Sequence, residues 1–161
     1  MATSKTARAW VAEPHKAEEV ASLLVAFRNH MSFDWPSDNA FLASVERLLE
    51  DRETEFLLAA PDNDSPAAGV LQLRFRFSVW KAAPDGWLED LFVSADARRA
   101  GLGDALVTLA IERARARGAR RIELDCNERN TGAQALYERH GFSPRSKGSE
   151  GRDLFLGRPI D

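Results

Sequence analysis

A short run between residues 98 and 103 has the composition of an anion-binding loop. The run reads Arg98-Arg99-Ala100-Gly101-Leu102-Gly103 and leads directly into a predicted helix. Its glycines let backbone amides turn toward an anion, and the helix start adds unpaired N–H groups and a partial positive charge. Arg98 and Arg99 add full charges that can hold phosphate oxygens. A diphosphate is the ligand that this combination suits.

The loop differs from two common phosphate-binding patterns. Asp104-Ala105-Leu106 follows Gly103 without the third glycine of a dinucleotide-binding turn, and no Gly-Lys-Ser/Thr sequence follows as in a P-loop. Glycines before a helix also occur in tight strand-to-helix connections that bind nothing. The surrounding residues must therefore decide between the two readings.

The whole chain has the composition of one folded domain over residues 1–161. Hydrophobic residues make up 44% of the chain and charged residues 29%, while 22 basic and 25 acidic side chains give a net charge of −3. This mild charge disfavours nucleic-acid binding, and the single Cys126, read as a small buried apolar residue, excludes a disulfide framework. Three scattered histidines predict no metal site. With neither a long apolar run nor a secretory leader, we expect a soluble, cytoplasmic protein that binds no membrane.

Hydrophobic periodicity and turn residues divide the chain into alternating elements. Strands are expected over residues 6–11, 55–60, 68–80, 87–93 and 121–126, with final strands at Phe142 and over 153–156. Helices are expected over residues 17–30, from Ser37 or Asp38 to 49, and over 103–117 and 131–139. Residues 82–86 are expected to form the turn of an antiparallel hairpin, and the third helix implies a parallel crossover. The predicted fold class is α/β with a mixed sheet.

The segment from residue 87 to residue 142 resembles the Gcn5-related N-acetyltransferase (GNAT) family. Arg98, Gly101 and Gly103 match its pattern Arg/Gln-x-x-Gly-x-Gly/Ala between a strand and a helix. The likeness continues through Asn130, Ala133 and Leu136-Tyr137-Glu138 to His140-Gly141-Phe142. The strand Trp87–Val93 is similar to that of spermidine/spermine-type and related small-amine enzymes. The resemblance implies a central mixed sheet with helices on both faces.

The resemblance also implies a site for acetyl-CoA. The main chain of Leu91, Phe92 and Val93 would pair with the pantetheine amides, and the loop from Arg98 to Gly103, with Asp104 and Ala105, would hold the diphosphate. Asn130, Ala133 and Tyr137 would flank the pantetheine and thioester. The strands carrying 91–93 and 124–126 would splay apart to open a slot. Asp104 departs from the neutral or basic residue of many members, so we expect its amide to contribute while its carboxylate faces solvent.

Acetyl transfer to an amine requires a base for the amine and a proton for the departing sulfur. Tyr137, the only tyrosine of the chain, is the expected acid, since a phenol with a pKa of about 10 can protonate a thiolate. Glu89 is the expected base, directly or through water, because its counterpart in the polyamine-type enzymes is a candidate base. The structural alternatives are core packing for Tyr137 and an ion-paired strand position for Glu89.

Strand alternation bears on the choice of base. Glu89, Leu91 and Val93 are expected on one face of their strand, and Leu88, Asp90 and Phe92 on the other. Glu89 and Asp90 are therefore not expected to face the same pocket.

Acceptor contacts are expected from the segment between the first strand and the second helix. Phe27, Asp34 and Trp35, with His30 and Phe33, form an aromatic and acidic cluster before Pro36. With Glu89, this cluster could hold a cationic amine by charge and by ring faces. The same residues also fit a hydrophobic hinge between two helices.

The resemblance implies an N-acetyltransferase that transfers an acetyl group directly from acetyl-CoA to the primary amine of a small molecule. Two alternatives remain open, a non-catalytic acyl-CoA-binding module and a protein or peptide N-acetyltransferase. The family often forms dimers, so a homodimer is compatible with the sequence.

Overall fold

The computed structural model describes residues 6–145, 148 and 150–161. The chain forms two units, one that ends at Leu124 and one that runs from Asp125 to Asp161, and each is described by itself. Among the described residues, no helix combines the length and the apolar character that a membrane crossing requires.

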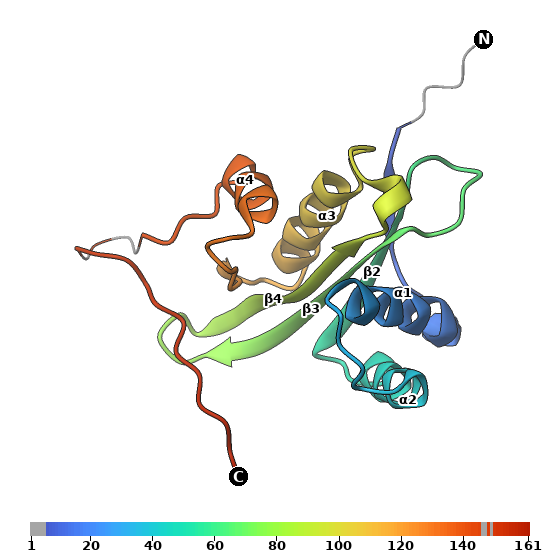
Figure 1. Cartoon of the computed structure of the whole chain (residues 1–161). Helices are drawn as coiled ribbons and strands as arrows, with labels where there is room; N and C mark the ends of the chain where they lie inside the picture. The colour runs from blue at the N-terminus through green and yellow to red at the C-terminus, as the bar shows by residue number, and fades with distance from the viewer. Residues whose placement is uncertain (1–5, 146–147, 149) are drawn as a thin grey trace. The chain divides into compact units, whose positions relative to one another are not determined.

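A five-stranded mixed sheet organises the first unit (Figure 1). Its strands, in spatial order, are β1 (Arg8–Val11), β2 (Thr54–Ala60), β3 (Gly69–Ser78), β4 (Ala83–Val93) and β5 (Arg121–Glu123). The first four strands pair antiparallel, and β5 pairs parallel to β4. The predicted fold class, the hairpin of β3 and β4 and the parallel pairing after the third helix are confirmed.

Two helices cover one face of this sheet. They are α1 (Ala17–His30), which follows the short 3-10 turn η1 (Pro14–Lys16), and α2 (Asp38–Leu49), whose N-cap Ser37 accepts a hydrogen bond from the Ala40 amide. Val20 and Leu24 of α1 and Val45 of α2 are buried in one cluster with Phe56 and Phe92 from the sheet. The apolar residues whose spacing predicts these helices therefore also form this half of the core.

The third helix, α3 (Leu102–Ala116), packs on the opposite face. A Cβ atom at Gly69 would lie 3.2 Å from Leu106 Cδ1 and 3.5 Å from Leu102 Cδ2. Glycine at this position of β3 thus allows the helix to approach the strand closely. Helices on both faces of the sheet agree with the predicted architecture.

Two arginines of α3 and its C-terminal end pair with the buried Glu55 of β2. Glu55 accepts hydrogen bonds from Arg113 Nε at 2.9 Å, from Arg113 Nη2 at 2.7 Å and from Arg117 Nε at 3.0 Å. Burial raises the pKa of Glu55, but the hydrogen bonds and charges of the two arginines outweigh burial, so the pKa lies below its ordinary value. The carboxylate form of Glu55 is therefore part of the packed unit.

The second unit contains α4 (Thr131–Arg139), which coincides with the predicted helix. Asn130 caps it by accepting a hydrogen bond from the Ala133 amide at 3.1 Å. The helix ends before Gly141, whose φ of +84° is the left-handed conformation that glycine adopts readily.

The expected turn over residues 82–86 is wrong. The strand β4 begins at Ala83, and the turn lies earlier, where the Ala82 amide donates to the Val79 carbonyl at 3.3 Å. The β3–β4 ladder extends to the pairs Phe77 with Pro84 and Ser78 with Ala83. Proline is tolerated close to the start of a strand, so the turn composition of 82–86 was misleading.

Three expectations for the end of the chain are also corrected. The strand β5 stops at Glu123 rather than Cys126, and Cys126 is exposed rather than buried. Neither Phe142 nor residues 153–156 form a strand, and the described residues of this part show only an isolated bridge between Arg145 and Arg152. Leu154, Phe155 and Leu156 are strongly exposed. These residues have the composition of a strand, but no strand among the described residues pairs with them. Pairing with a neighbour is what stabilises a strand.

Candidate active site

The predicted anion-binding loop has exposed, unusual backbone at the start of α3. After β4 the chain passes through η2 (Ala95–Ala97) and reaches Arg99 at a φ of +65° and Gly101 at +84°. Gly101 is the N-cap of α3 and supplies no side-chain acceptor, whereas Ser37 and Asn130 cap their helices with side chains. Without a side-chain cap, the first amides of α3 suit an anion.

The exposure, conformation and charge of this loop fit a diphosphate. Residues 98–101 are exposed, so a ligand can reach their backbone. The left-handed conformation at Gly101 is one that a residue with a Cβ rarely adopts, and the loop adds two arginines to the helix start. The donor set is thus cationic and built from amides, as a diphosphate requires.

Arg98 also has a structural contact. Its Nε donates to the Val93 carbonyl at 3.2 Å, and its Nη2 lies 3.3 Å from His30 Nε2. The His30 ring accepts this bond when its own proton is on Nδ1. Arg98 therefore connects the loop to the end of β4 and to α1, in addition to any contact with a ligand.

The expected cofactor strand has an open edge. β5 pairs with β4 only from Asp85 to Trp87, whereas Leu91–Val93 pair with β3 through the partners Gly69–Leu71. Among the residues that the structure describes, no strand pairs with the other edge of Leu91–Val93. Apart from the Val93 carbonyl, which accepts from Arg98, the main chain along this edge is therefore available to an extended ligand with amide groups.

A β-bulge interrupts β4 beside this segment and corrects the expected alternation. Asp90 lies opposite Gln72, but Leu88 lies opposite Leu73, so Glu89 is the extra residue of the ladder. Leu88 and Asp90 consequently lie on opposite faces of the sheet. Glu89 Oε1 lies 3.4 Å from Nη1 of Arg74, a β3 residue on the Gln72 face. Glu89 and Asp90 thus both extend toward the face that α1 and α2 cover, contrary to the expectation.

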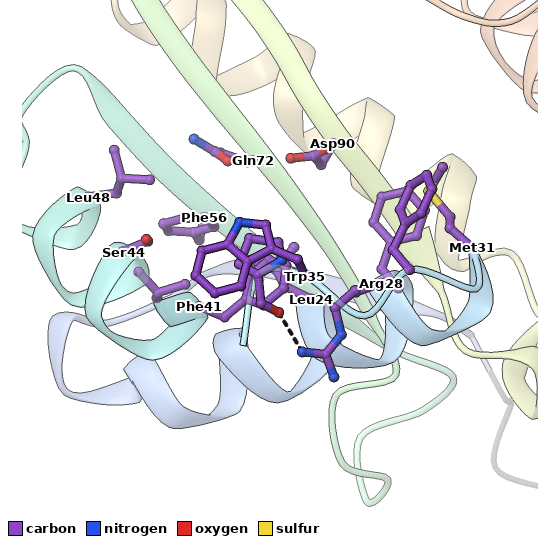
Figure 2. A pocket seen from close by; sticks show the side chains of 14 residues that line it. Leu24, Arg28, Met31, Trp35, Phe41, Ser44, Leu48, Phe56, Gln72 and Asp90 are labelled. Atoms are coloured by element: carbon purple, nitrogen blue, oxygen red, sulfur yellow. Dashed lines mark hydrogen bonds between the residues drawn. The ribbon is translucent and has the colours of Figure 1, made fainter. Parts of the chain in front are cut away.

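A cavity of about 300 Å³ lies on this face, between the sheet and the first two helices. Its aromatic walls are Phe27, Phe33, Trp35, Phe41 and Phe56. Its aliphatic walls are Leu24, Met31, Pro36, Val45 and Leu48. Its polar lining residues are Arg28, Ser44, Gln72 and Asp90. Figure 2 shows Gln72 and Asp90 on neighbouring strands at one side of the cavity, with Ser44 and Leu48 of α2 at another.

The cavity includes part of the predicted acceptor site. Phe27 and Trp35 line it, whereas Asp34 and Glu89 are not among its lining residues. Gln72, Arg28 and Asp90 were not predicted for this site. Asp90 is not predictable as a lining residue, because the sequence does not reveal the bulge that places it beside Glu89 on one face of the sheet.

Arg28 holds the loop that closes one side of the cavity. Its Nη1 donates to the Pro36 carbonyl at 2.6 Å, and its Nη2 lies 2.8 Å from Asp38 Oδ1 (Figure 2 shows the bond to Pro36). These contacts fasten the segment that carries Trp35 to the start of α2. The charge of Arg28 is balanced by Asp38.

The second unit carries the remaining predicted residues. Ala133 and Tyr137 are four residues apart on α4 and therefore share a helix face. The Tyr137 ring contacts the Phe142 ring edge-on, with centroids 5.8 Å apart. No group of three or more His, Cys, Asp or Glu side chains within the described ranges is placed to hold a metal ion.

Comparison with known proteins gives the class of the protein. The model of the acetyltransferase (GNAT) family matches residues 18–142, so the chain belongs to this family. Members are acetyltransferases that use acetyl-CoA, and the chain is therefore an acetyl-CoA-dependent N-acetyltransferase.

Several curated relatives differ in their named acceptors. The chain is 29% identical over 133 residues to glucosamine 6-phosphate N-acetyltransferase 1 of Oryza sativa subsp. japonica, covering 80% of this chain and 78% of the relative. It is 30% identical over 132 residues to the uncharacterized N-acetyltransferase YhfO of Bacillus subtilis, covering 79% and 85%. A mycothiol acetyltransferase of Beutenbergia cavernae is 40% identical over 70 residues, which span 42% of this chain and 24% of that protein. Family membership therefore leaves the acceptor open.

Solved structures share the fold over nearly the whole chain. A crystal structure described as an acetyltransferase from Arthrobacter sp. FB24 superposes with a TM-score of 0.84 at 27% identity and covers 99% of both chains. The aminoglycoside N-acetyltransferase AAC(6')-Iy, solved in complex with CoA, gives a TM-score of 0.76 at 19% identity and also covers 99% of both chains. These likenesses confirm the GNAT fold.

Proposed function

We propose that the chain acetylates the primary amine of a small molecule by direct transfer from acetyl-CoA. The observation that carries this proposal is the position of the cavity. Asp90 lines the cavity, and the next residue, Leu91, begins the open edge of β4. An acceptor in the cavity and a cofactor along this edge would therefore meet at one point of one strand.

In this proposal, three parts of the chain hold the cofactor, which supplies an acetyl group activated as a thioester. The amides of residues 101–105, with the charges of Arg98 and Arg99, hold the diphosphate. The main chain of Leu91–Val93 pairs with the pantetheine, and its N–H groups stabilise negative charge on the reacting carbonyl oxygen. Asn130, Ala133 and Tyr137 of the second unit flank the pantetheine and thioester.

Glu89 is the proposed base. It accepts a proton from the attacking amine, directly or through one water, while the amine nitrogen forms its bond to the acetyl carbon. The bulge turns Glu89 toward the face of the cavity, and Arg74 lies within 3.4 Å of its carboxylate. This arrangement supports a role through water, since Glu89 is not itself a lining residue of the cavity.

Tyr137 is the proposed acid. Its phenol donates a proton to the sulfur as the carbon–sulfur bond breaks, which leaves the free thiol of coenzyme A and an N-acetylated amine. The edge-on contact with Phe142 orients the ring within the second unit. The similarity of the strand Trp87–Val93 to small-amine enzymes supports the same acceptor class.

Thiol release from acetyl-CoA in the presence of a panel of primary amines tests the proposal. We expect release that depends on the amine, with an N-acetylated product of matching mass. Binding of coenzyme A without thiol release for any amine or peptide would instead indicate a non-catalytic module. Release with peptides alone would indicate a peptide acetyltransferase.

A further inference from the structure

The contact between Arg98 and His30 joins the anion-binding loop to the last turn of α1. We infer that His30 is a positioning residue, which orders the Arg98 guanidinium for the diphosphate of coenzyme A before the cofactor binds. This inference rests on the proposed function, which assigns Arg98 to the diphosphate, and it adds a residue from a distant helix to that site.

His30 itself is held by the packing beneath it. It is the last residue of α1, a helix whose apolar side is buried against the sheet. Its ring packs on the buried Phe92, with the ring centroids 6.0 Å apart and the ring planes at 45°. Phe27, one turn earlier in α1, stacks on the same Phe92 ring at 5.1 Å. His30 therefore has a defined position next to the strand segment that the proposal assigns to the pantetheine.

The two contacts of Arg98 leave part of its guanidinium for a ligand. Nε donates to the Val93 carbonyl at 3.2 Å, and Nη2 lies 3.3 Å from His30 Nε2. Nε and Nη2 share one edge of the planar guanidinium, whereas Nη1 has no hydrogen-bond partner among the described residues. Nη1 and the second N–H of Nη2 can therefore donate to phosphate oxygens while both contacts are kept.

An arginine that is ordered in the free protein binds an anion more tightly, because its side-chain freedom is not lost when the ligand arrives. Arg98 and His30 are both exposed, so their contact contributes little to the stability of the fold. Arg99, the next residue, makes no hydrogen bond to α1 within the described part of the chain. The contact with His30 thus distinguishes two neighbouring arginines that the proposal assigns to the same diphosphate.

Calorimetric titration with coenzyme A, on variants whose folding is verified by circular dichroism, tests the inference. His30→Ala should weaken the Kd by about fivefold, because the ordering of Arg98 is lost. His30→Gln should stay within about twofold of the wild type, because the side-chain oxygen of glutamine can accept a hydrogen bond from Arg98 Nη2. An unchanged Kd in His30→Ala would overturn the inference. A tighter Kd would also overturn it, since the contact with His30 would then compete with the cofactor.

A double-mutant cycle separates positioning of Arg98 from a general structural effect of His30. Arg98→Ala should weaken the Kd by about tenfold through loss of charge-assisted hydrogen bonds. Adding His30→Ala to it should change the Kd by less than about twofold, because no guanidinium is left to order. Arg99→Ala is the matched control, and its loss should multiply with that of His30→Ala. If the losses of His30→Ala and Arg98→Ala also multiply, the inference is overturned.

The same titrations separate this inference from the proposed function. A Kd that is weakened in Arg98→Ala but unchanged in His30→Ala would overturn the inference alone. A Kd that Arg98→Ala leaves unchanged would overturn the inference together with the role of Arg98, whereas amine-dependent thiol release would still support the proposed reaction. If the folded wild-type protein binds no coenzyme A, the proposed cofactor site and the inference are both overturned.

Discussion

Asp90 of β4 lies directly opposite Gln72 of β3, and both side chains line the same cavity. The bulge at Glu89 produces this relationship, because it places Asp90 and Leu88 on opposite faces of the sheet. Two consecutive acidic residues thus extend toward the same face of the sheet. Of the two, Asp90 lines the cavity and Glu89 is the proposed base.

Tyr137→Phe should lower kcat by about 100-fold or more, in line with the loss of a general acid. The Kd of coenzyme A should stay within about twofold, since phenylalanine retains the ring contact with Phe142. Steady-state kinetics and equilibrium binding measure the two quantities. Unchanged turnover in this variant would remove Tyr137 from the mechanism.

Glu89→Gln should lower kcat/KM for the amine by about 100-fold, because the amide cannot accept the proton. Arg74→Gln is the matched control, since it removes the ion pair of Glu89 but keeps the carboxylate. We expect a much smaller loss in this control. Equal losses in both variants would assign Glu89 a structural role as the partner of Arg74.

Gly101→Ala should weaken coenzyme A binding by about tenfold, because it disturbs amides that the proposal assigns to the diphosphate. It should also cost about 1 kcal/mol of unfolding free energy, since φ at this position is +84°. Gly118→Ala is the control, because Gly118 has a φ of +76° beyond the other end of the same helix and open space around it. It should cost similar stability and leave the Kd unchanged. A weakened Kd in both variants would contradict a specific role for Gly101.

Glu55→Gln should lower the unfolding free energy by about 2 kcal/mol at pH 7, because Arg113 and Arg117 lose charge-assisted hydrogen bonds to the carboxylate. The pKa of Glu55 is lowered from its ordinary value of 4.5 in the folded state. The stabilisation is therefore complete above the unfolded pKa and is lost as the pH falls through the folded pKa.

Urea unfolding of wild type and Glu55→Gln between pH 7 and pH 3 measures this dependence. The difference between the two proteins should shrink as the pH falls below about 4.5. Glu112→Gln, at an exposed position of α3, should show little difference at any pH. A difference that stays constant down to pH 3 would contradict the assigned role of the ion pair.

The sequence predicted most elements because their signals are local. The spacing of Val20 and Leu24 defines α1, Ser37 caps α2, and the glycine loop precedes α3 as expected. The strand β4 was misplaced at its start, because Pro84 and Gly86 have turn composition while the long β3 ladder holds them in a strand. The extent of one domain over residues 1–161 stays a prediction.

The candidate site was predictable where it depends on local sequence. Composition and spacing predict the loop 98–103 and the aromatic residues Phe27 and Trp35, and their roles in binding stay predictions. The sequence does not predict that Asp90 lies opposite Gln72, because this position depends on the register between two strands. The contact of Arg98 with His30 joins residues 68 positions apart, and no local pattern indicates it.

We propose that the loop around Gly101 and the edge Leu91–Val93 bind coenzyme A. Isothermal titration of coenzyme A into the wild-type protein, with folding verified by circular dichroism, measures this binding. We expect measurable heat and saturation near one coenzyme A per chain. Absence of heat from the folded protein, together with no change in its thermal unfolding on addition of coenzyme A, would contradict the claim.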